Sequence, residues 1–151
     1  MAEEKKIGAI KEELQAAEDS MLPDFIARYE KDERSGVKSL VEKAGKRIQK
    51  LEAEYARIEN LKKYEKEYAD AGYICGIDEV GRGPLAGPVV AGAVILPKDC
   101  DILYINDSKK LSASMREKLY DEIMEKAVAT GIGMAGPGRI DEINILQATY
   151  E

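Results

Sequence analysis

Residues 73–96 have the sequence YICGIDEVGRGPLAGPVVAGAVIL. Two apolar runs rich in β-branched residues flank a loop of glycine and proline, and Pro97 ends the second run. This pattern predicts a β-hairpin. Because both runs are almost continuously apolar, we expect the two strands to be buried on both faces of their sheet.

The residues after the hairpin predict a helix, a third strand and a last helix. We expect Ser112 or Ser114 to cap the first helix, because both precede an apolar face at helical spacing. Residues 131–135 form a weaker candidate strand, and residues 138–151 predict a helix that is still running at the last residue. The order β-β-α-β-α indicates an α/β or α+β fold.

The first 70 residues differ in composition from the rest of the chain. They contain only three of the 13 glycines and are rich in charge, which favours helices. We therefore predict a helical N-terminal extension at residues 1–70, arranged as a helical hairpin or small bundle, and a second domain at 71–151. The longest helix of the N-terminal extension carries an apolar stripe of Val41, Ala44, Ile48, Leu51, Tyr55 and Ile58.

The composition excludes several classes of chemistry. The 151 residues contain no histidine, so Ser/His/Asp and Cys/His catalysis and histidine-bearing zinc sites are ruled out. Any catalysis must rest on carboxylates, Lys, Tyr, Cys or Ser. The chain has 23 Lys and Arg against 29 Asp and Glu, a net charge of −6, which argues against passive binding to a phosphate backbone.

No segment suggests export or membrane insertion. No apolar run reaches the roughly 18–20 residues of a membrane span, and no apolar core follows the charged start at residues 1–6, so we predict no signal peptide. The two cysteines, Cys75 and Cys100, are too few for a disulfide framework. We expect them to be reduced thiols of a cytoplasmic protein.

Two acids, Asp78 and Glu79, end the first apolar run. A buried carboxylate is costly unless it is paired or binds a metal. Either Asp78 accepts hydrogen bonds from the turn that follows, or the two acids hold a metal ion. Consecutive strand residues point to opposite faces, so a shared site requires the chain to bend near Gly81. Mg²⁺ would then complete its shell with water and substrate phosphate.

The loop after these acids matches a dinucleotide fingerprint, GxGxxA, at residues 81–86. That function requires a helix to open at the loop, whereas a β-branched run follows here, so we reject it. Gly81 and Gly83 would instead allow the backbone to approach a ligand, with Arg82 meeting a phosphate or sugar.

A second polar cluster, NDSKKLS, occupies residues 106–112. It is either a solvated turn that leads into a helix cap, or a place where Lys109 or Lys110 contacts a phosphate.

Three segments together resemble the signatures of bacterial ribonuclease HII, the type 2 ribonuclease H. They are residues 76–90, 107–112 and 140–149, and they follow the family's order and spacing. The resemblance covers residues 73–151 almost continuously. It implies an α/β, ribonuclease H-like fold with a mixed sheet flanked by helices.

The resemblance also implies an activity and a site. The family is a group of endonucleases that hydrolyse the RNA strand of RNA–DNA hybrids and cut at ribonucleotides embedded in duplex DNA, using Mg²⁺ or Mn²⁺. Asp78 and Glu79 match its first two catalytic, metal-binding acids. The loop Gly81-Arg82-Gly83 matches the one that recognises the 2′-hydroxyl, and Lys109 and Lys110 match a motif near the substrate backbone. A monomeric, cytoplasmic protein without a membrane partner is implied.

The family's remaining catalytic aspartates, and a tyrosine that stacks on the junction sugar, lie downstream of the third signature. We therefore expect residues 1–151 to be an N-terminal fragment with an incomplete sheet and no cleavage activity of its own. Two alternatives remain open: a non-catalytic binder of RNA–DNA junctions, and a helical interaction protein acting through residues 1–70.

Residues 1–70 resemble an N-terminal extension of some bacterial members. They either grip a duplex or present a solvated helix face balanced by acids. The basic residues behind the first possibility are Lys43, Lys46, Arg47, Lys50, Arg57, Lys62 and Lys63.

Overall fold

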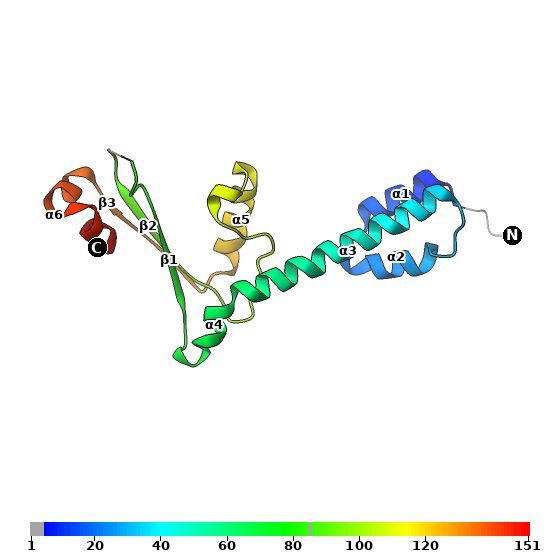
Figure 1. The fold of residues 1–151 in the computed structure, drawn as a ribbon, viewed down its shortest axis with the longest axis horizontal. Coiled ribbons are helices and arrows are strands. Elements are labelled where there is room, and N and C mark those ends of the chain that lie inside the picture. The colour runs from blue at the N-terminus through cyan, green and yellow to red at the C-terminus, as the bar shows by residue number, and fades with distance from the viewer. Residues whose placement is uncertain (1–4, 85) are drawn as a thin grey trace. The chain divides into compact units, whose positions relative to one another are not determined.

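The computed structural model describes residues 5–84 and 86–151, and the chain divides into two compact units, 1–59 and 60–151 (Figure 1). The chain forms helices up to residue 71, and after that residue it forms a three-stranded sheet and two α-helices. In order, the elements are α1 (Ile7–Ala16), a 3-10 turn (Asp19–Met21), α2 (Leu22–Tyr29), α3 (Ser35–Leu61), α4 (Lys63–Glu67), a 3-10 turn (Ala69–Ala71), β1 (Cys75–Val80), β2 (Val89–Ile95), a 3-10 turn (Ser108–Lys110), α5 (Ala113–Lys126), β3 (Ala129–Ala135) and α6 (Pro137–Tyr150).

The first unit is a small helical bundle, as its apolar spacing predicts. α1, α2 and the first half of α3 contribute one apolar face each to a common core, which removes these side chains from water. Pro23 lies in the first turn of α2, where its missing N–H leaves no hydrogen bond unmade. The buried side chains are Ile10, Leu22, Phe25, Val37, Leu40 and Ala44.

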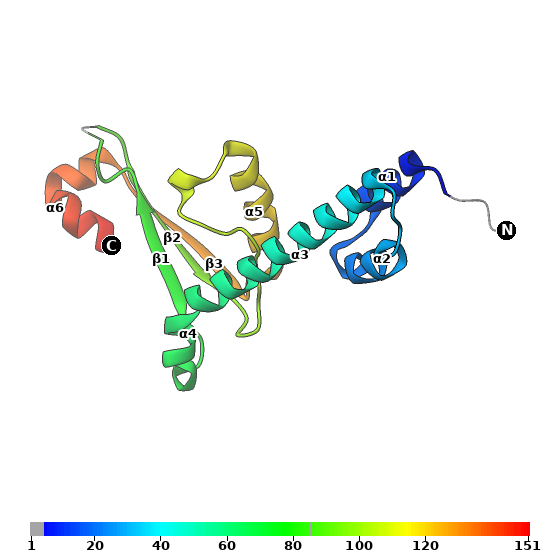
Figure 2. The same cartoon turned by 45° about the vertical axis from the view of Figure 1, so that its right-hand side comes forward.

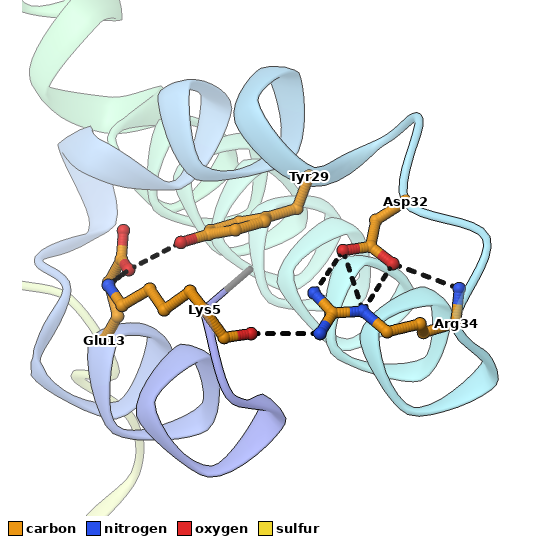
Figure 3. A network of polar contacts seen from close by, with 5 residues as sticks. All are labelled: Lys5, Glu13, Tyr29, Asp32 and Arg34. Carbon is orange, nitrogen blue, oxygen red and sulfur yellow. Dashed lines mark hydrogen bonds and ion pairs between the residues drawn. The ribbon is translucent and has the colours of Figure 1, made fainter. Parts of the chain in front are cut away.

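Polar contacts join the helices at the edge of this core (Figure 3). The Glu13 carboxylate accepts hydrogen bonds from the Tyr29 hydroxyl at 2.8 Å and from Arg28 at 2.6 Å, and it also pairs with Lys5. The Arg34 guanidinium donates to both oxygens of Asp32 and, at 3.0 Å, to the Lys5 carbonyl. These contacts connect α1, α2 and the start of α3.

The second unit contains the predicted hairpin, and the α/β fold class is confirmed. β1 and β2 pair antiparallel from Cys75 opposite Ile95 to Val80 opposite Val90, and β3 pairs antiparallel with the other side of β2. All pairings among the described strands are antiparallel, so the parallel part of a mixed sheet is not among them. α6 packs on β2 and β3, beside the end of the sheet where β2 begins (Figures 1 and 2).

The expectation that both hairpin strands are buried on both faces is wrong for β1, whereas in β2 Val89 is buried and the residues after it are half-buried. Ile77 and Val80 of β1 are 72% and 68% exposed, and Ile132 of β3 is 77% exposed. The physical reason is the small amount of chain that covers the sheet, because α6 packs on β2 and β3 while β1 lies at an edge. An apolar run shows that a strand can be buried and not that another element covers it.

Local signals at α5 identify its start. Ser112 is the N-cap residue, and its hydroxyl accepts the Met115 N–H at 3.3 Å; the Ser114 hydroxyl lies 3.2 Å from that of Ser112.

No helix of the described residues is long and apolar enough to cross a bilayer. The predicted domain boundary after Asp70 stays a prediction.

Candidate active site

β1 carries the two candidate catalytic acids directly before it ends at Val80. Asp78 lies opposite Gly92 of β2, which in turn lies opposite Ile132 of β3, while Glu79 lies opposite Ala91. Cross-strand neighbours share a face of the sheet and consecutive residues alternate, so the two carboxylates leave the strand on opposite faces. The bend that a shared site requires comes after Glu79, at Gly81.

The two acids have different surroundings. Asp78 is exposed, and its Oδ1 accepts the N–H of Glu79 at 2.9 Å. This hydrogen bond therefore comes from the adjacent residue of its own strand and not from the following turn. Glu79 is half-buried, and its Oε1 lies 3.4 Å from Nη1 of Arg82. Arg82 thus links the end of β1 to the candidate recognition loop.

The loop is closed by a backbone approach that only glycine permits. Gly81 has φ of +90°, and a Cβ atom placed on it would lie 2.3 Å from the carbonyl oxygen of Pro88. That distance is far below van der Waals contact, and φ in this range is unfavourable for other residues. A Cβ on Gly83 would meet no atom of the described residues within 4 Å, so none of those residues crowds this position.

The donor set suits a divalent cation in its chemistry. Carboxylate oxygens are the ligands that Mg²⁺ and Mn²⁺ prefer, and Mg²⁺ is often held by one or two carboxylates together with water and phosphate. Among the described residues, no group of three or more acids, cysteines or histidines is placed to hold a metal. By its chemistry, each of the carboxylates of Asp78 and Glu79 suits such an ion as one ligand among several, although the two leave β1 on opposite faces.

Lys109 and Lys110 lie in a separate, well-defined turn. The Asp107 carboxylate accepts the Lys109 N–H at 3.0 Å and the Asp107 carbonyl accepts the Lys110 N–H at 2.8 Å. Both lysines are exposed. The predicted turn leading to a helix cap is therefore present, and both ammonium groups lack a partner among the described residues. No hydrogen bond or ion pair within those residues joins this turn to Asp78, Glu79 or the glycine loop.

Arg116 holds this turn, although the sequence does not single it out. Its Nη1 donates to the carbonyls of Ser108 at 3.2 Å and Leu111 at 2.7 Å, so the first turns of α5 fix the position of the lysines. Nothing in the sequence distinguishes this arginine from the others of the chain.

The structure contains a pocket on the β2–β3 part of the sheet that the sequence did not predict. It has a volume of about 270 Å³ and lies between α6 and one face of β2 and β3. Ala91 and Gly133, which share the cross-strand row of Glu79, line it, as do Arg139 and Glu151. Hydrogen bonds to Glu151 first, and to Glu142 second, raise the pKa of Arg139, and Arg139 lowers the pKa of Glu151.

α6 itself, which contains the third signature segment, is interrupted. Asn144 has φ of 69° and ψ of 163°, so the helix consists of two parts. The Asn144 side-chain oxygen accepts the N–H groups of Leu146 at 3.0 Å and Gln147 at 3.2 Å, as an N-cap does.

Comparisons with known proteins give a consistent result. Residues 6–69 match the family model described as "Ribonuclease HII N-terminal domain", and residues 75–150 match "Ribonuclease HII". Ribonuclease HII of Lachnoclostridium phytofermentans is 61% identical over 146 residues, covering 97% of this chain and 58% of that protein. Ribonuclease HII of Enterococcus faecalis is 50% identical over 153 residues, covering 100% of this chain and 59% of that protein.

Among solved structures, ribonuclease H2 from Pyrococcus horikoshii OT3 is 30% identical, with a TM-score of 0.41, over 50% of this chain and 39% of that chain. The chain spans 58–59% of the length of the two bacterial relatives above. From the matches to both family models and the identity to these relatives, the chain belongs to the ribonuclease HII family.

Proposed function

We propose that this protein is a metal-dependent endonuclease that hydrolyses the RNA strand of RNA–DNA hybrids and cuts at ribonucleotides embedded in duplex DNA. Family membership supports the class of hydrolase. The observation that carries the assignment of the site is the pair Asp78 and Glu79 at the end of β1, directly before a loop that only glycine can close.

The chain's own residues would have distinct roles. Asp78 and Glu79 would hold Mg²⁺ or Mn²⁺, which supplies an activated water and stabilises the leaving oxygen when bound. Gly81, Arg82 and Gly83 would present backbone groups and a guanidinium to the 2′-hydroxyl, the group that distinguishes RNA from DNA. The open space at Gly83 supports a close approach of the sugar.

Lys109 and Lys110 would contact the phosphates beside the cut. Their exposure and the hydrogen-bonded turn that carries them support this role, since a lysine binds phosphate as a point charge and needs only to be placed within reach. By the same reasoning from the family, we propose a monomer located in the cytoplasm, with residues 1–70 as an extension of the catalytic domain at 71–151. The cysteines Cys75 and Cys100 are free thiols, which supports a reducing compartment.

We also propose that residues 1–151 alone do not cleave. Asp78 and Glu79 leave β1 on opposite faces, no larger group of candidate ligands occurs among the described residues, and a two-metal site needs further ligands. The same observation favours a second candidate function for this stretch of chain: binding an RNA–DNA junction through residues 81–83 without cutting it.

The test is cleavage of a labelled DNA duplex with one ribonucleotide, and of an RNA–DNA hybrid, by the whole protein with Mg²⁺ or Mn²⁺. We expect Asp78→Asn and Glu79→Gln to lower kcat by at least about 100-fold, because each removes a charged metal ligand. Substrate binding without metal should stay close to wild type. Asp121→Asn, which changes an exposed acid of α5 outside the site, is the matched control and should keep its kcat within a few-fold.

Three results would contradict the proposal. Full activity of Asp78→Asn would show that Asp78 is not part of the catalytic site. Metal-dependent cleavage by the purified 151-residue chain, lost in its Asp78→Asn variant, would show that these residues suffice. Tight binding of the embedded ribonucleotide without any product from the whole protein would favour the non-catalytic binder.

A further inference from the structure

The turn that carries the two candidate phosphate-binding lysines is held by a side chain of α5. Nη1 of Arg116 donates to the carbonyl oxygen of Ser108 at 3.2 Å and to that of Leu111 at 2.7 Å. Ser108 directly precedes Lys109, and Leu111 directly follows Lys110. One guanidinium therefore fixes the backbone on both sides of the two lysines.

Backbone hydrogen bonds alone hold this turn only weakly. It is a 3-10 turn of three residues, and 3-10 hydrogen bonds have poorer geometry than those of an α-helix. The Leu111 N–H donates to the Ser108 carbonyl at 3.2 Å, at the long end of the normal range. Leu111 precedes the N-cap of α5, so its own carbonyl oxygen lies outside the helical hydrogen-bond pattern. Arg116 donates to both oxygens and so connects the turn to a helix of 14 residues.

Neither helix stability nor burial explains an arginine at this position. Arg116 follows the N-cap residue Ser112 by four residues, close to the positive end of the α5 macrodipole, where a cation is unfavourable. Its side chain is exposed and forms no ion pair with any described acid. The structural contribution of this residue is therefore its contact with the turn.

We propose that Arg116 is a positioning residue for substrate binding, which keeps the turn in the conformation in which Lys109 and Lys110 contact phosphates. This rests on the proposed function of the two lysines. Consecutive residues of a 3-10 turn point about 120° apart, so each ammonium group can reach a different phosphate. An ordered turn also reduces the entropy lost on binding, because only the lysine side chains, and not the backbone, must then be fixed.

The alternative is that Arg116 itself binds a phosphate through Nε or Nη2, which form no hydrogen bond with any described residue. The use of Nη1 favours positioning, because this nitrogen carries two N–H groups and donates to two oxygens of the turn. Both roles predict weaker substrate binding when Arg116 is replaced. A positioning residue, however, acts only through the lysines, whereas a direct phosphate contact adds to theirs.

The test is a double-mutant cycle in the whole protein. Arg116→Gln, Lys109→Gln/Lys110→Gln and the combined triple variant are compared in cleavage of an RNA–DNA hybrid with Mg²⁺, and in hybrid affinity measured by fluorescence anisotropy in EDTA. We expect Arg116→Gln to raise KM and Kd by about 3–10-fold and to change kcat by less than about 2-fold, because it weakens ground-state and transition-state binding equally. In the background without the two lysines, the same replacement should change KM and Kd by less than about 1.5-fold.

Two further variants complete the design. Lys118→Gln removes a positive charge from an exposed residue of α5 that has no hydrogen bond or ion pair with any described residue, and it should bind like the wild type. Arg116→Lys keeps the charge and a donor but not the planar fork, so its KM should lie between those of the wild type and Arg116→Gln. Arg116→Lys also takes the place of Arg116→Gln in the cycle if circular dichroism shows that the latter is unfolded.

Three outcomes would overturn the proposal. Wild-type KM and Kd in Arg116→Gln, or an equal loss in Lys118→Gln, would show that the contact with the turn does not serve binding. A loss of the same size with and without the two lysines would show that Arg116 contacts the substrate directly.

The same measurements separate this inference from the proposed function. A whole protein that binds the hybrid with the expected non-additivity but never cleaves it would refute the endonuclease and leave the role of Arg116 intact. Cleavage that requires Asp78 but is unchanged in Arg116→Gln would refute the role of Arg116 and leave the endonuclease intact.

Discussion

At the scale of single residues, Gly81 is the position where the backbone leaves least freedom. Its φ of +90° and the 2.3 Å that would separate a Cβ atom at this position from the Pro88 oxygen add two separate penalties to any side chain. We expect Gly81→Ala to destabilise the protein by about 1–3 kcal/mol, the range for a residue held in an unfavourable backbone conformation. Chemical denaturation monitored by circular dichroism measures this change.

Gly83→Ala is the matched control, because its new methyl group would meet no atom of the described residues within 4 Å. Its unfolding free energy should stay within about 1 kcal/mol of the wild type. If both variants unfold at the same denaturant concentration, the contact between Gly81 and Pro88 does not hold the loop.

Asn144 also has a backbone conformation that favours glycine, but it carries a polar side chain. Its φ of 69° and ψ of 163° fall in a region that is almost exclusive to glycine, where a residue costs about 1–3 kcal/mol. The carboxamide offsets part of this cost by accepting two N–H groups at the start of the second part of α6. Strain and capping therefore oppose each other at a single residue.

The two smallest replacements at Asn144 should act in opposite directions. Asn144→Gly removes the strain and, because glycine is itself a tolerable cap, loses only a few tenths of a kcal/mol of capping, so we expect a gain of about 1 kcal/mol. Asn144→Ala keeps the strain and loses the cap, so it should be destabilising by about 1 kcal/mol. Thermal unfolding of both variants is the measurement, and destabilisation by glycine would contradict the backbone geometry.

At the scale of elements, the sequence predicts those structural features that depend on residues close together in the chain. The two apolar runs and the loop between them specify the hairpin, and Ser112 specifies the start of α5. The break in α6 was not predicted, because Asn144 lies inside a regular apolar pattern without an internal proline or glycine nearby. The pocket between α6 and the sheet was not predicted for a related reason, because it depends on how α6 packs on β2 and β3.

Exposure of the sheet also depends on distant parts of the chain. An apolar run looks the same whether a helix covers it or not, so the exposure of Ile77 and Ile132 could not be inferred from their own segments. The ion pair of Arg47 could not be inferred for the same reason, because its partner Asp19 lies 28 positions away. The period of the sequence shows on which face of a helix a residue lies, but it does not show which residue elsewhere in the bundle forms an ion pair with it.

At the scale of the whole molecule, the ion pairs and the absence of histidine determine how stability varies with pH. Hydrogen bonds, first from Lys5 and then from Tyr29, lower the pKa of Glu13, and the Arg34 guanidinium lowers the pKa of Asp32. The pKa of Lys5 is raised, and its hydrogen bond to Glu13 is the main cause. No side chain has an ordinary pKa between those of the acids and those of the thiols.

Stability should therefore be nearly constant between about pH 5.5 and 7.5. The lowered pKa values of Glu13 and Asp32 contribute stability that is present above their ordinary range near 4 and is lost as pH falls through the folded values. The raised pKa of Lys5 contributes stability that is fully present below the ordinary lysine value of about 10.4 and is lost as pH rises through the folded value.

Unfolding midpoints measured from about pH 2.5 to 7.5 test this dependence. We expect a fall below about pH 4 that is smaller in Glu13→Gln, because glutamine keeps the hydrogen-bond acceptor and removes the titrating charge. Glu12→Gln is the control, since the Glu12 carboxylate is exposed and has no partner among the described residues, and it should follow the wild type. A decline centred near about pH 6.5 in the wild type would contradict the assignment, because no group of this chain ordinarily titrates there.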